Sequence, residues 1–245
     1  KENKYDDDIF FQKYSQMSRS QQGLAGAGEW ETLRKLLPDF KDKRVLDLGC
    51  GYGWHCIYAM EHGASSVVGV DISHKMLEVA KEKTHFPQVE YKCCAIEDVE
   101  FPEESFDVIL SSLAFHYVAD YEILVKKIYR ILKSGGKLVF TVEHPVFTAY
   151  GTQDWYYNEK GEILHFPVDN YYYEGKRTAV FLGEKVTKYH RTLTTYLNTL
   201  LSNGFIINHI VEPQPPEYMM DIPGMQDEMR RPMMLIVSAN KKVDR

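Results

Sequence analysis

The stretch "VLDLGCGYG", residues 45–53, puts an apolar segment directly before three glycines in five positions. Glycine permits a sharp turn and a close approach of the backbone to a ligand, because it has no Cβ atom to collide. A helical pattern follows at residues 54–62, so the stretch predicts a strand, a glycine loop and the start of a helix. This arrangement presents backbone amides to a ligand at the carboxyl end of a parallel strand.

An acidic residue at the end of the next predicted strand narrows the choice of ligand. The stretch "VVGVD" ends at Asp71, 20 residues beyond Gly51. A carboxylate at this spacing can accept hydrogen bonds from both hydroxyls of a ribose. The glycine loop and Asp71 together predict a site for a nucleoside.

Strand and helix patterns alternate along most of the chain. Such alternation predicts βαβ units, and therefore a Rossmann-like, doubly wound α/β fold with a seven-stranded, mostly parallel sheet. Strands are predicted at 44–48, 66–70, 89–92, 106–111, 137–142, 205–212 and 232–240, and helices at 54–62, 74–83, 121–132 and 192–202, with "KSGG" at 133–136 ending the third of these helices.

Composition excludes several classes of protein. The 245 residues carry a net charge of -6, and nucleic-acid affinity depends on basic side chains that neutralise phosphates, so a nucleic-acid partner is not expected. The four cysteines form no CxxC pair, which predicts reduced thiols and no metal site. No apolar run reaches the roughly 18 residues of a membrane span, and the first residues contain no signal-peptide core. A cytoplasmic protein without a membrane partner is therefore predicted.

The glycine spacing separates two kinds of nucleoside ligand. A pyrophosphate-binding loop has the pattern G-x-G-x-x-G, whereas the glycines here are Gly49, Gly51 and Gly53. The carboxylate of Asp47 would repel a pyrophosphate, but it suits a cation such as the amino group and sulfonium of S-adenosylmethionine. In these features the chain resembles the class I S-adenosylmethionine-dependent methyltransferases, most closely the small-molecule branch called type 11 or UbiE-like. The resemblance covers residues 45–142 with specific motifs and extends loosely to residue 240.

The resemblance implies S-adenosylmethionine as the cofactor. The glycine loop would line its methionine part, with Asp47 acting directly or through water, while Asp71 would bind the ribose and Ile72 would pack on the adenine. The segment at 111–118, "SSLAFHYV", would face the transferred methyl group. The candidate cofactor-binding residues are Asp47, Gly49, Cys50, Gly51, Asp71, Ile72, Ala95, Ile96, Glu97 and Ser111.

The adenine end departs from the family pattern. The stretch "CCAIEDVEFPEESFDVI", residues 93–109, matches a family motif whose leading acid usually meets the adenine amino group. Ala95 occupies the position of that acid, so the usual side-chain contact is missing. Either backbone amides at Ile96 or the carboxylate of Glu97, displaced by two positions, would take its place.

Methyl transfer from a sulfonium is an in-line displacement that mainly requires alignment of the nucleophile and the methyl group. A base is needed as well when the acceptor is a hydroxyl, an acidic carbon or an ammonium. The candidates are His116 at the end of the fourth strand, His144 just after the fifth, and Tyr14 or Arg19 in the lead segment. His116 is favoured because strand ends at this edge face the ligand. The alternative role for His116 is that of a packed, hydrogen-bonded residue.

One domain is expected over residues 1–245. Residues 1–40 would form a lid segment, as in this family, and a helix at 29–37; residues 41–142 would form the cofactor-binding core, and residues 191–245 the rest of the sheet, with an antiparallel last strand. Residues 143–190 break the alternating pattern and are expected to form a small cap over the substrate, inserted between strands five and six. The acidic run at 6–8 is expected to be a solvated tail.

The acceptor is expected to be a small molecule, because residues 111–118 carry neither the [DN]PP[YF] motif of DNA amino-methylating enzymes nor the Pro-Cys pair of cytosine C5 enzymes. In the insertion, Tyr171–Tyr173 and Trp155–Tyr157 would form either an aromatic wall for the acceptor or a packing face, such as a homodimer contact. Arg191 would either clamp an acceptor carboxylate or phosphate, or be a solvated neighbour of the helix N-cap Thr192.

Two other functions fit part of this pattern. An NAD-dependent oxidoreductase uses a related sheet, although the glycine spacing and Asp47 oppose it. A protein that binds S-adenosylmethionine without catalysis needs no base, and no base in the sequence is unambiguous. The favoured interpretation is a methyltransferase that acts on a small molecule.

Overall fold

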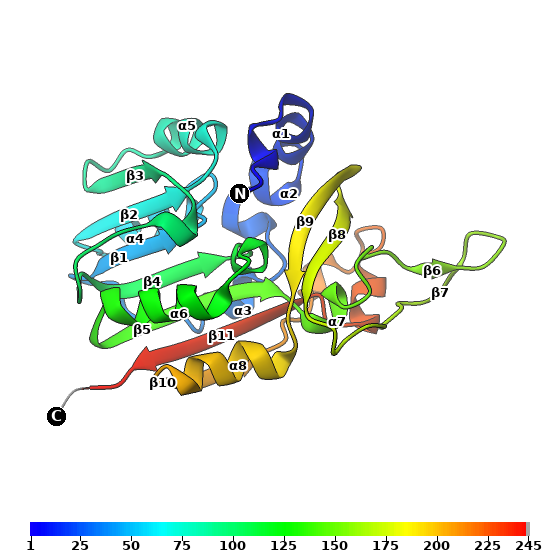
Figure 1. The fold of residues 1–245 in the computed structure, drawn as a ribbon. Coiled ribbons are helices and arrows are strands. Elements are labelled where there is room, and N and C mark those ends of the chain that lie inside the picture. The colour runs from blue at the N-terminus through cyan, green and yellow to red at the C-terminus, as the bar shows by residue number, and fades with distance from the viewer. Residues whose placement is uncertain (244–245) are drawn as a thin grey trace.

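The computed structural model describes residues 1–243, and seven strands form one sheet (Figure 1). Their order is β10-β11-β5-β4-β1-β2-β3, in which β1 to β5 are parallel and β11 is antiparallel to both of its neighbours. This confirms the predicted doubly wound sheet. The strands are β1 (Arg44–Leu48), β2 (Ser66–Asp71), β3 (Val89–Cys93), β4 (Phe106–Ser112), β5 (Leu132–Glu143), β10 (Phe205–Val211) and β11 (Met234–Lys241).

The direction in which the chain builds the sheet reverses beside β1. Strands β2 and β3 follow on one side of β1, whereas β4 and β5 lie on its other side. Ligands of open α/β sheets bind outside the carboxyl ends of the strands at such a reversal. The reversal between β1 and β4 therefore places the expected site directly beyond the glycine loop.

Helices cover both faces of the sheet, as Figure 1 shows. Alternate residues of a strand point to opposite faces, so Val45 packs with the first helical layer and Leu46 with the second. The first layer consists of α3 (Trp30–Leu33), α4 (Trp54–Glu61) and α5 (His74–Lys83), and the second of α6 (Tyr121–Ile131) and α8 (Leu193–Ser202). Side chains of Ser73, Asp120 and Thr192 cap the N-termini of α5, α6 and α8.

Two helix ends differ from the prediction. The helix expected at 29–37 is reduced to α3, which ends at Leu33, well before Pro38. Helix α6 ends at Ile131, and the "KSGG" stretch belongs to the extended start of β5. The physical reason is Leu132, which is fully buried and pairs with Phe106 of β4. Leu132 is therefore the first residue of the strand and not the last residue of the helix.

The N-terminal segment contradicts the expectation of a solvated acidic tail. Asp7 is the N-cap of α1 (Asp8–Ser15), and its carboxylate accepts hydrogen bonds from the amides of Ile9 and Phe10. The Asp6 carboxylate accepts hydrogen bonds from the Ser73 hydroxyl and from two amides at the start of α5. Asp6 thus ties the N-terminal segment to the carboxyl end of β2.

The insertion between β5 and β10 breaks the alternation of strands and helices, as expected. It contains α7 (Pro145–Thr148) and two hairpins, β6 (Tyr156–Tyr157) with β7 (Ile163–His165) and β8 (Gly175–Phe181) with β9 (Glu184–His190). The β8–β9 hairpin lies beside α1, where Phe10 packs on Ala179 and Val186, whereas the β6–β7 hairpin projects from the body (Figure 1). The insertion and the N-terminal segment therefore meet above the sheet edge.

Short helical segments complete the description. They are η1 (Lys4–Asp6), α2 (Ser18–Gln21), η2 (Gly23–Gly26), η3 (Ile96–Asp98), η4 (Phe115–Tyr117), η5 (Glu217–Met219) and η6 (Gln226–Arg230). Within residues 1–243, none of the helices is both long and apolar enough to span a bilayer.

Candidate active site

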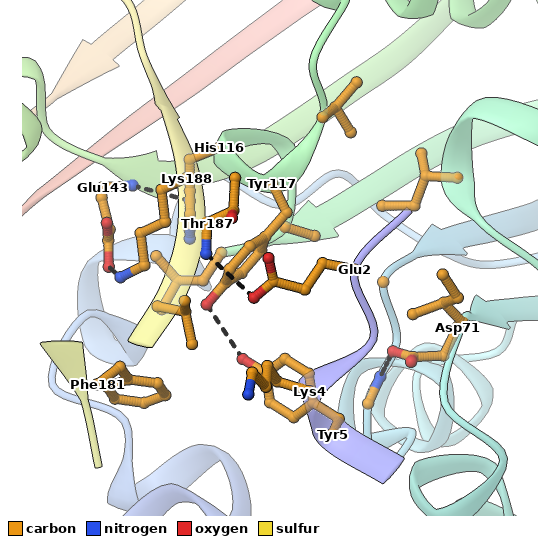
Figure 2. A pocket seen from close by; sticks show the side chains of 18 of the residues that line it. Glu2, Lys4, Tyr5, Asp71, His116, Tyr117, Glu143, Phe181, Thr187 and Lys188 are labelled. Atoms are coloured by element: carbon orange, nitrogen blue, oxygen red, sulfur yellow. Dashed lines mark hydrogen bonds and ion pairs between the residues drawn. The ribbon is translucent and has the colours of Figure 1, made fainter. Parts of the chain in front are cut away.

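A cavity of about 420 Å³ lies at the carboxyl ends of β1, β2, β4 and β5. Its floor comes from the strand ends, and its roof comes from residues 1–5 and the β8–β9 hairpin. One hydrogen bond joins the two parts of the roof, since the Glu2 carboxylate accepts from the Thr187 amide at 3.2 Å. A second joins the roof to η4, where the Tyr5 and Tyr117 hydroxyls lie 3.2 Å apart (Figure 2). The volume is within the range of small-molecule sites.

The three glycines of the loop have different roles, although all three have positive φ angles. A Cβ atom on Gly49 would lie 2.4 Å from the Ala114 Cβ, and one on Gly53 would lie 2.2 Å from the Tyr91 hydroxyl. Around Gly51 a Cβ atom would meet nothing within 4 Å. Packing therefore requires the outer glycines, while Gly51 leaves its backbone open to the cavity.

The loop amides differ from the expectation that they point at a ligand. The amides of Gly49 and Cys50 both donate to the Val70 carbonyl, at 2.8 and 2.9 Å. The Gly51 amide donates to the Asp71 carboxylate at 2.9 Å. The tight return from β1 into α4 uses these three donors internally, so what these residues offer a ligand is the open surface of Gly51.

Asp71 faces the cavity at the end of β2. Its two oxygens accept hydrogen bonds from the amides of Gly51 and Ser73, each at 2.9 Å. Burial raises the pKa of Asp71 although these hydrogen bonds oppose the rise. Each carboxylate oxygen has a further lone pair, so Asp71 can still accept from two hydroxyl groups. Four predicted adenine-side residues line the cavity as well: Ile72, Ala95, Ile96 and Glu97.

Three predicted cofactor residues lie outside the main cavity. Asp47 is fully buried beneath the glycine loop, where one oxygen is 3.5 Å from the Cys56 sulfur and the other has no hydrogen-bond partner among the described residues. Cys50 lines a smaller cavity of about 80 Å³, which adjoins the main one and shares Gly49, Gly51 and Ser112 with it. The Ser111 hydroxyl donates to the Leu48 carbonyl at 2.7 Å, and its neighbour Ser112 reaches the main cavity instead.

The end of the cavity opposite Asp71 holds a buried ion pair that the sequence did not indicate (Figure 2). Lys188 of β9 is 2% exposed, and its Nζ atom is 2.5 Å from the Glu143 carboxylate at the end of β5. Gln153 joins both groups: its Oε1 accepts from Lys188 at 2.8 Å, and its Nε2 donates to Glu143 at 2.5 Å. Burial opposes ionisation of Glu143, but His116, Lys188 and these hydrogen bonds outweigh it and lower its pKa.

His116 lies beside this pair and lines the cavity. The Glu143 amide donates to its Nδ1 atom at 3.4 Å, and burial lowers the pKa of His116 to about 4. The imidazole is therefore neutral at neutral pH. Because Nδ1 accepts a hydrogen bond, the ring proton is on Nε2.

Comparison with known proteins agrees with this geometry. A family model of the methyltransferase domain matches residues 46–140. A solved structure from Listeria monocytogenes, assigned as an S-adenosylmethionine-dependent methyltransferase, is 58% identical, and the match covers 90% of this chain and 99% of that one with a TM-score of 0.86. The chain belongs to the S-adenosylmethionine-dependent methyltransferases. The methyltransferase fold with its seven-stranded sheet makes it a class I enzyme, with S-adenosylmethionine as cofactor.

Two further relatives match the methyltransferase over different shares of their length. An S-adenosylmethionine-dependent methyltransferase structure from Mesorhizobium loti is 40% identical, with a TM-score of 0.83, and the match covers 89% of this chain and all of that one. The ubiquinone biosynthesis O-methyltransferase of Coxiella burnetii is 36% identical over 112 residues, which are 45% of this chain and 47% of that protein. The second likeness is thus confined to about half of each protein.

Three observations show that the residues of the methyltransferase fit this cofactor. Gly51 leaves a surface that no side chain fills, and Asp71 has acceptor capacity directed at the cavity. The unpaired oxygen of Asp47 is a buried acceptor next to the loop, which suits a cationic group reached through water. Gly51 and Asp71 meet at one end of the cavity, and Asp47 lies beneath the loop at that end.

The buried carboxyl of Asp47 should make stability depend on pH. Burial raises its pKa to about 7 in the folded protein, so between the ordinary carboxyl range and pH 7 the folded state binds a proton that the unfolded state does not. Folding stability from this group therefore falls as pH rises. The Asp47→Asn variant lacks this group. As the pH rises from 5 to 8, we therefore expect its unfolding free energy to rise by on the order of 2–3 kcal/mol relative to that of the wild type, as measured by urea denaturation. A difference that does not change with pH would contradict this.

The other catalytic candidates occupy unlike positions. His144 lies outside the main cavity, because it caps α7 through Nδ1 and its Nε2 is 2.7 Å from the Glu212 carboxylate. Tyr14 lines the cavity, and burial raises its pKa, so its hydroxyl is protonated at neutral pH. Arg19 also reaches the cavity, with its guanidinium on both oxygens of buried Glu29 at 3.1 and 3.0 Å.

The aromatic clusters of the insertion do not line the cavity. Tyr172 and Tyr173 are 87% and 75% exposed, and the Tyr171 hydroxyl instead accepts a hydrogen bond from the Leu193 amide. The aromatic wall predicted from these residues was therefore wrong. The rings that do line it come mainly from other segments: Tyr5, Tyr14, Tyr117, Phe181 and Tyr189.

Arg191 contradicts both of its predicted roles. It is 5% exposed, and its guanidinium donates to the backbone carbonyls of Phe115, Val118 and Ala119, the last at 3.0 Å. These carbonyls belong to the turn that follows β4. Arg191 therefore holds the segment that carries His116 and is not available to clamp an acceptor.

Proposed function

We propose that the methyltransferase moves the methyl group of S-adenosylmethionine to a small-molecule acceptor by in-line displacement. The observation that carries the proposal is a single cavity of about 420 Å³ that extends from Asp71 to His116 and Lys188 beneath a roof. A roofed cavity of this size suits a small acceptor, whereas a polynucleotide needs an open surface rich in basic side chains. The Coxiella burnetii relative, an O-methyltransferase of ubiquinone biosynthesis, supports the same class of acceptor.

The bound cofactor supplies a methyl group on a sulfonium, which leaves without acid catalysis. In the proposed arrangement Asp71 accepts hydrogen bonds from the ribose, Ile72 and Ile96 pack on the adenine, and Glu97 lies at the same edge. The glycine loop and Asp47 serve the methionine part. The main task of the chain is then to align acceptor and methyl group, which supplies on the order of 7–11 kcal/mol in well-oriented reactions.

His116 is the proposed acceptor-side group among the predicted catalytic residues. Its Nδ1 is occupied, so its free Nε2–H suits a hydrogen bond to the acceptor better than removal of a proton. Tyr14 is proposed to contact the ligands from the lid side. His144, outside the cavity, receives no role in this proposal.

The proposal includes a cytoplasmic location and contact between two copies. Free cysteines at positions 50, 56, 93 and 94 are typical of a reducing compartment. The exposed aromatic residues of the insertion, such as Tyr156 and Tyr172, are candidates for a homodimer contact.

The acceptor class can be tested with S-adenosylmethionine that carries an isotopic label in its methyl group. The enzyme is incubated separately with the small-molecule fraction and with the nucleic-acid and protein fractions of a bacterial lysate. We expect the label to enter the small-molecule fraction. Transfer only to nucleic acid or protein would overturn the small-molecule proposal while leaving the enzyme class intact.

A further inference from the structure

We propose that Lys188 binds an oxygen anion of the acceptor, either a carboxylate or a phenolate, and that the far end of the cavity selects against cationic acceptors. The inference deepens the proposed function and rests on it. Lys188 would be a specificity-determining residue, and Glu143 and Gln153 would hold it in position.

Lys188 is held by partners that leave part of its ammonium group available. The group has three N–H donors, and two of them are used by Glu143 at 2.5 Å and Gln153 at 2.8 Å. No other described residue accepts a hydrogen bond from it. The Nζ atom lies 5.4 and 5.9 Å from the ring centres of Phe181 and Tyr117, both of which line the cavity. One donor is therefore left in an apolar part of the cavity wall.

Stability alone gives a poor account of this ion pair. A buried pair of charges loses hydration, and replacing it with apolar side chains often leaves a protein as stable or more stable. Gln153 bridges both charges from a backbone with φ of +61°, a conformation that costs energy in a residue other than glycine. A strained residue that orients a buried charge at a ligand cavity points to a role in binding.

The hydrogen-bonding groups at this end are mostly donors. Each oxygen of Glu143 accepts one hydrogen bond, one from Lys188 and the other from Gln153, and Lys188 balances its charge. His116 presents Nε2–H, and the Tyr5 and Tyr117 hydroxyls share one hydrogen bond, which leaves one of their two protons to donate. An acceptor oxygen, preferably an anionic one, complements these donors.

The charged residues of the roof do not change this conclusion. Lys1, Glu2 and Lys4 all line the cavity, and one oxygen of the Glu2 carboxylate accepts from the Thr187 amide. The two lysines together outweigh the single negative charge of Glu2. Asp71 lies at the other end of the cavity (Figure 2). The carboxylate beside Lys188, that of Glu143, is already paired with it, so an ammonium group on the acceptor would meet a like charge there, and like charges repel more strongly at a partly enclosed site than in open water.

The same contact can activate the acceptor oxygen. A nearby ammonium favours the ionised form of a phenol, whose proton is released to solvent. A lone pair of the resulting oxygen anion forms the new O–C bond while the C–S bond breaks, and the bonding electrons stay on sulfur as a neutral thioether. Charge balances, since an anion and a sulfonium give two neutral products. A carboxylate acceptor reacts in the same way or is anchored by Lys188 beside another nucleophile.

The inference can be tested by binding to the wild-type enzyme saturated with S-adenosylhomocysteine, which cannot transfer a methyl group. The probes are benzoate, 4-nitrophenol, whose colour reports its ionisation, and benzylamine. We expect both oxygen acids to bind as anions and benzylamine to bind at least about tenfold more weakly. Binding of benzoate alone would identify a carboxylate site, and binding of 4-nitrophenolate alone a phenolate site; both results support the inference.

Substitutions at two lysines of β9 test whether anion binding depends on Lys188 in particular or on any positive charge of the strand. We expect Lys188→Met to lower anion affinity about tenfold or more, and to abolish the ionisation of bound 4-nitrophenol, while S-adenosylhomocysteine still binds. Lys185→Met, at an exposed position of β9, is the matched control and should bind like the wild type. Because Lys188→Met leaves Glu143 without its cation, Lys188→Met combined with Glu143→Gln is measured in parallel.

Two results would overturn the inference. One is tighter binding of benzylamine than of either anion to the wild type, and the other is unchanged anion binding in both Lys188 variants. If S-adenosylhomocysteine itself did not bind, the proposed function would fail, and the inference would fail with it. If it bound and neither anion did, only the inference would fail.

Discussion

Replacing Asp71 with alanine is expected to lower the affinity for S-adenosylmethionine about a hundredfold or more. Hydrogen bonds to an ionised group contribute roughly 1.5–3 kcal/mol each, and two ribose hydroxyls would lose their acceptor. The substitution also removes the partner of the Gly51 and Ser73 amides, which position the loop on one side and the start of α5 on the other. Calorimetric titration with S-adenosylmethionine and with S-adenosylhomocysteine measures the loss of affinity for each ligand.

A matched substitution controls for the loss of a negative charge. Glu90 is an exposed acid on β3, the strand next to β2, and Glu90→Ala should bind the cofactor like the wild type. Asp71→Asn retains one carbonyl oxygen and should fall between the wild type and Asp71→Ala. Equal affinity in all of these proteins would show that Asp71 does not hold the ribose.

Replacing Glu143 with leucine is expected to destabilise the protein by about 3–5 kcal/mol, since it leaves the Lys188 ammonium buried without a counter-ion. Glu143 has a lowered pKa in the folded state, so its contribution is present above the ordinary carboxyl pKa and is lost as the pH falls below it. Urea denaturation near neutral pH therefore measures the full effect.

A double substitution tests whether the loss of stability comes from the unpaired charge. Glu143→Leu combined with Lys188→Met removes both charges at similar volume and should recover most of the lost stability. The two single effects would then not add. If the double variant were as unstable as the sum of the single variants, the interaction between the two charges would not be the cause.

The elements of the core could be predicted because their signals are local. The bounds expected for β1 and α5 match those observed, and Asp71 lies at the end of β2 beside the glycine loop. An apolar strand, a glycine turn and a helix start within nine residues leave few alternatives for the backbone. Parallel strands then bring their carboxyl ends to one edge, which places Gly51 and Asp71 together.

The far end of the cavity could not be predicted because its contacts are distant in sequence. Lys188 and Glu143 are 45 residues apart and meet only because the insertion folds back over the sheet. Asp6 caps a helix whose first residues lie 67 to 69 positions further along the chain. A run of acidic residues resembles a solvated tail until the partner helix is in place. Arg191, next to a helix N-cap, likewise gave no sign that it binds the turn after β4.

A crystal structure of the enzyme with S-adenosylhomocysteine tests the central claim most directly, namely that one cavity joins the cofactor to the acceptor end. We expect the ribose hydroxyls on Asp71, the adenine beside Ile72 and Ile96, and the sulfur atom facing the end formed by His116 and Lys188. A ribose away from Asp71, or a sulfur atom facing away from His116, would contradict the account.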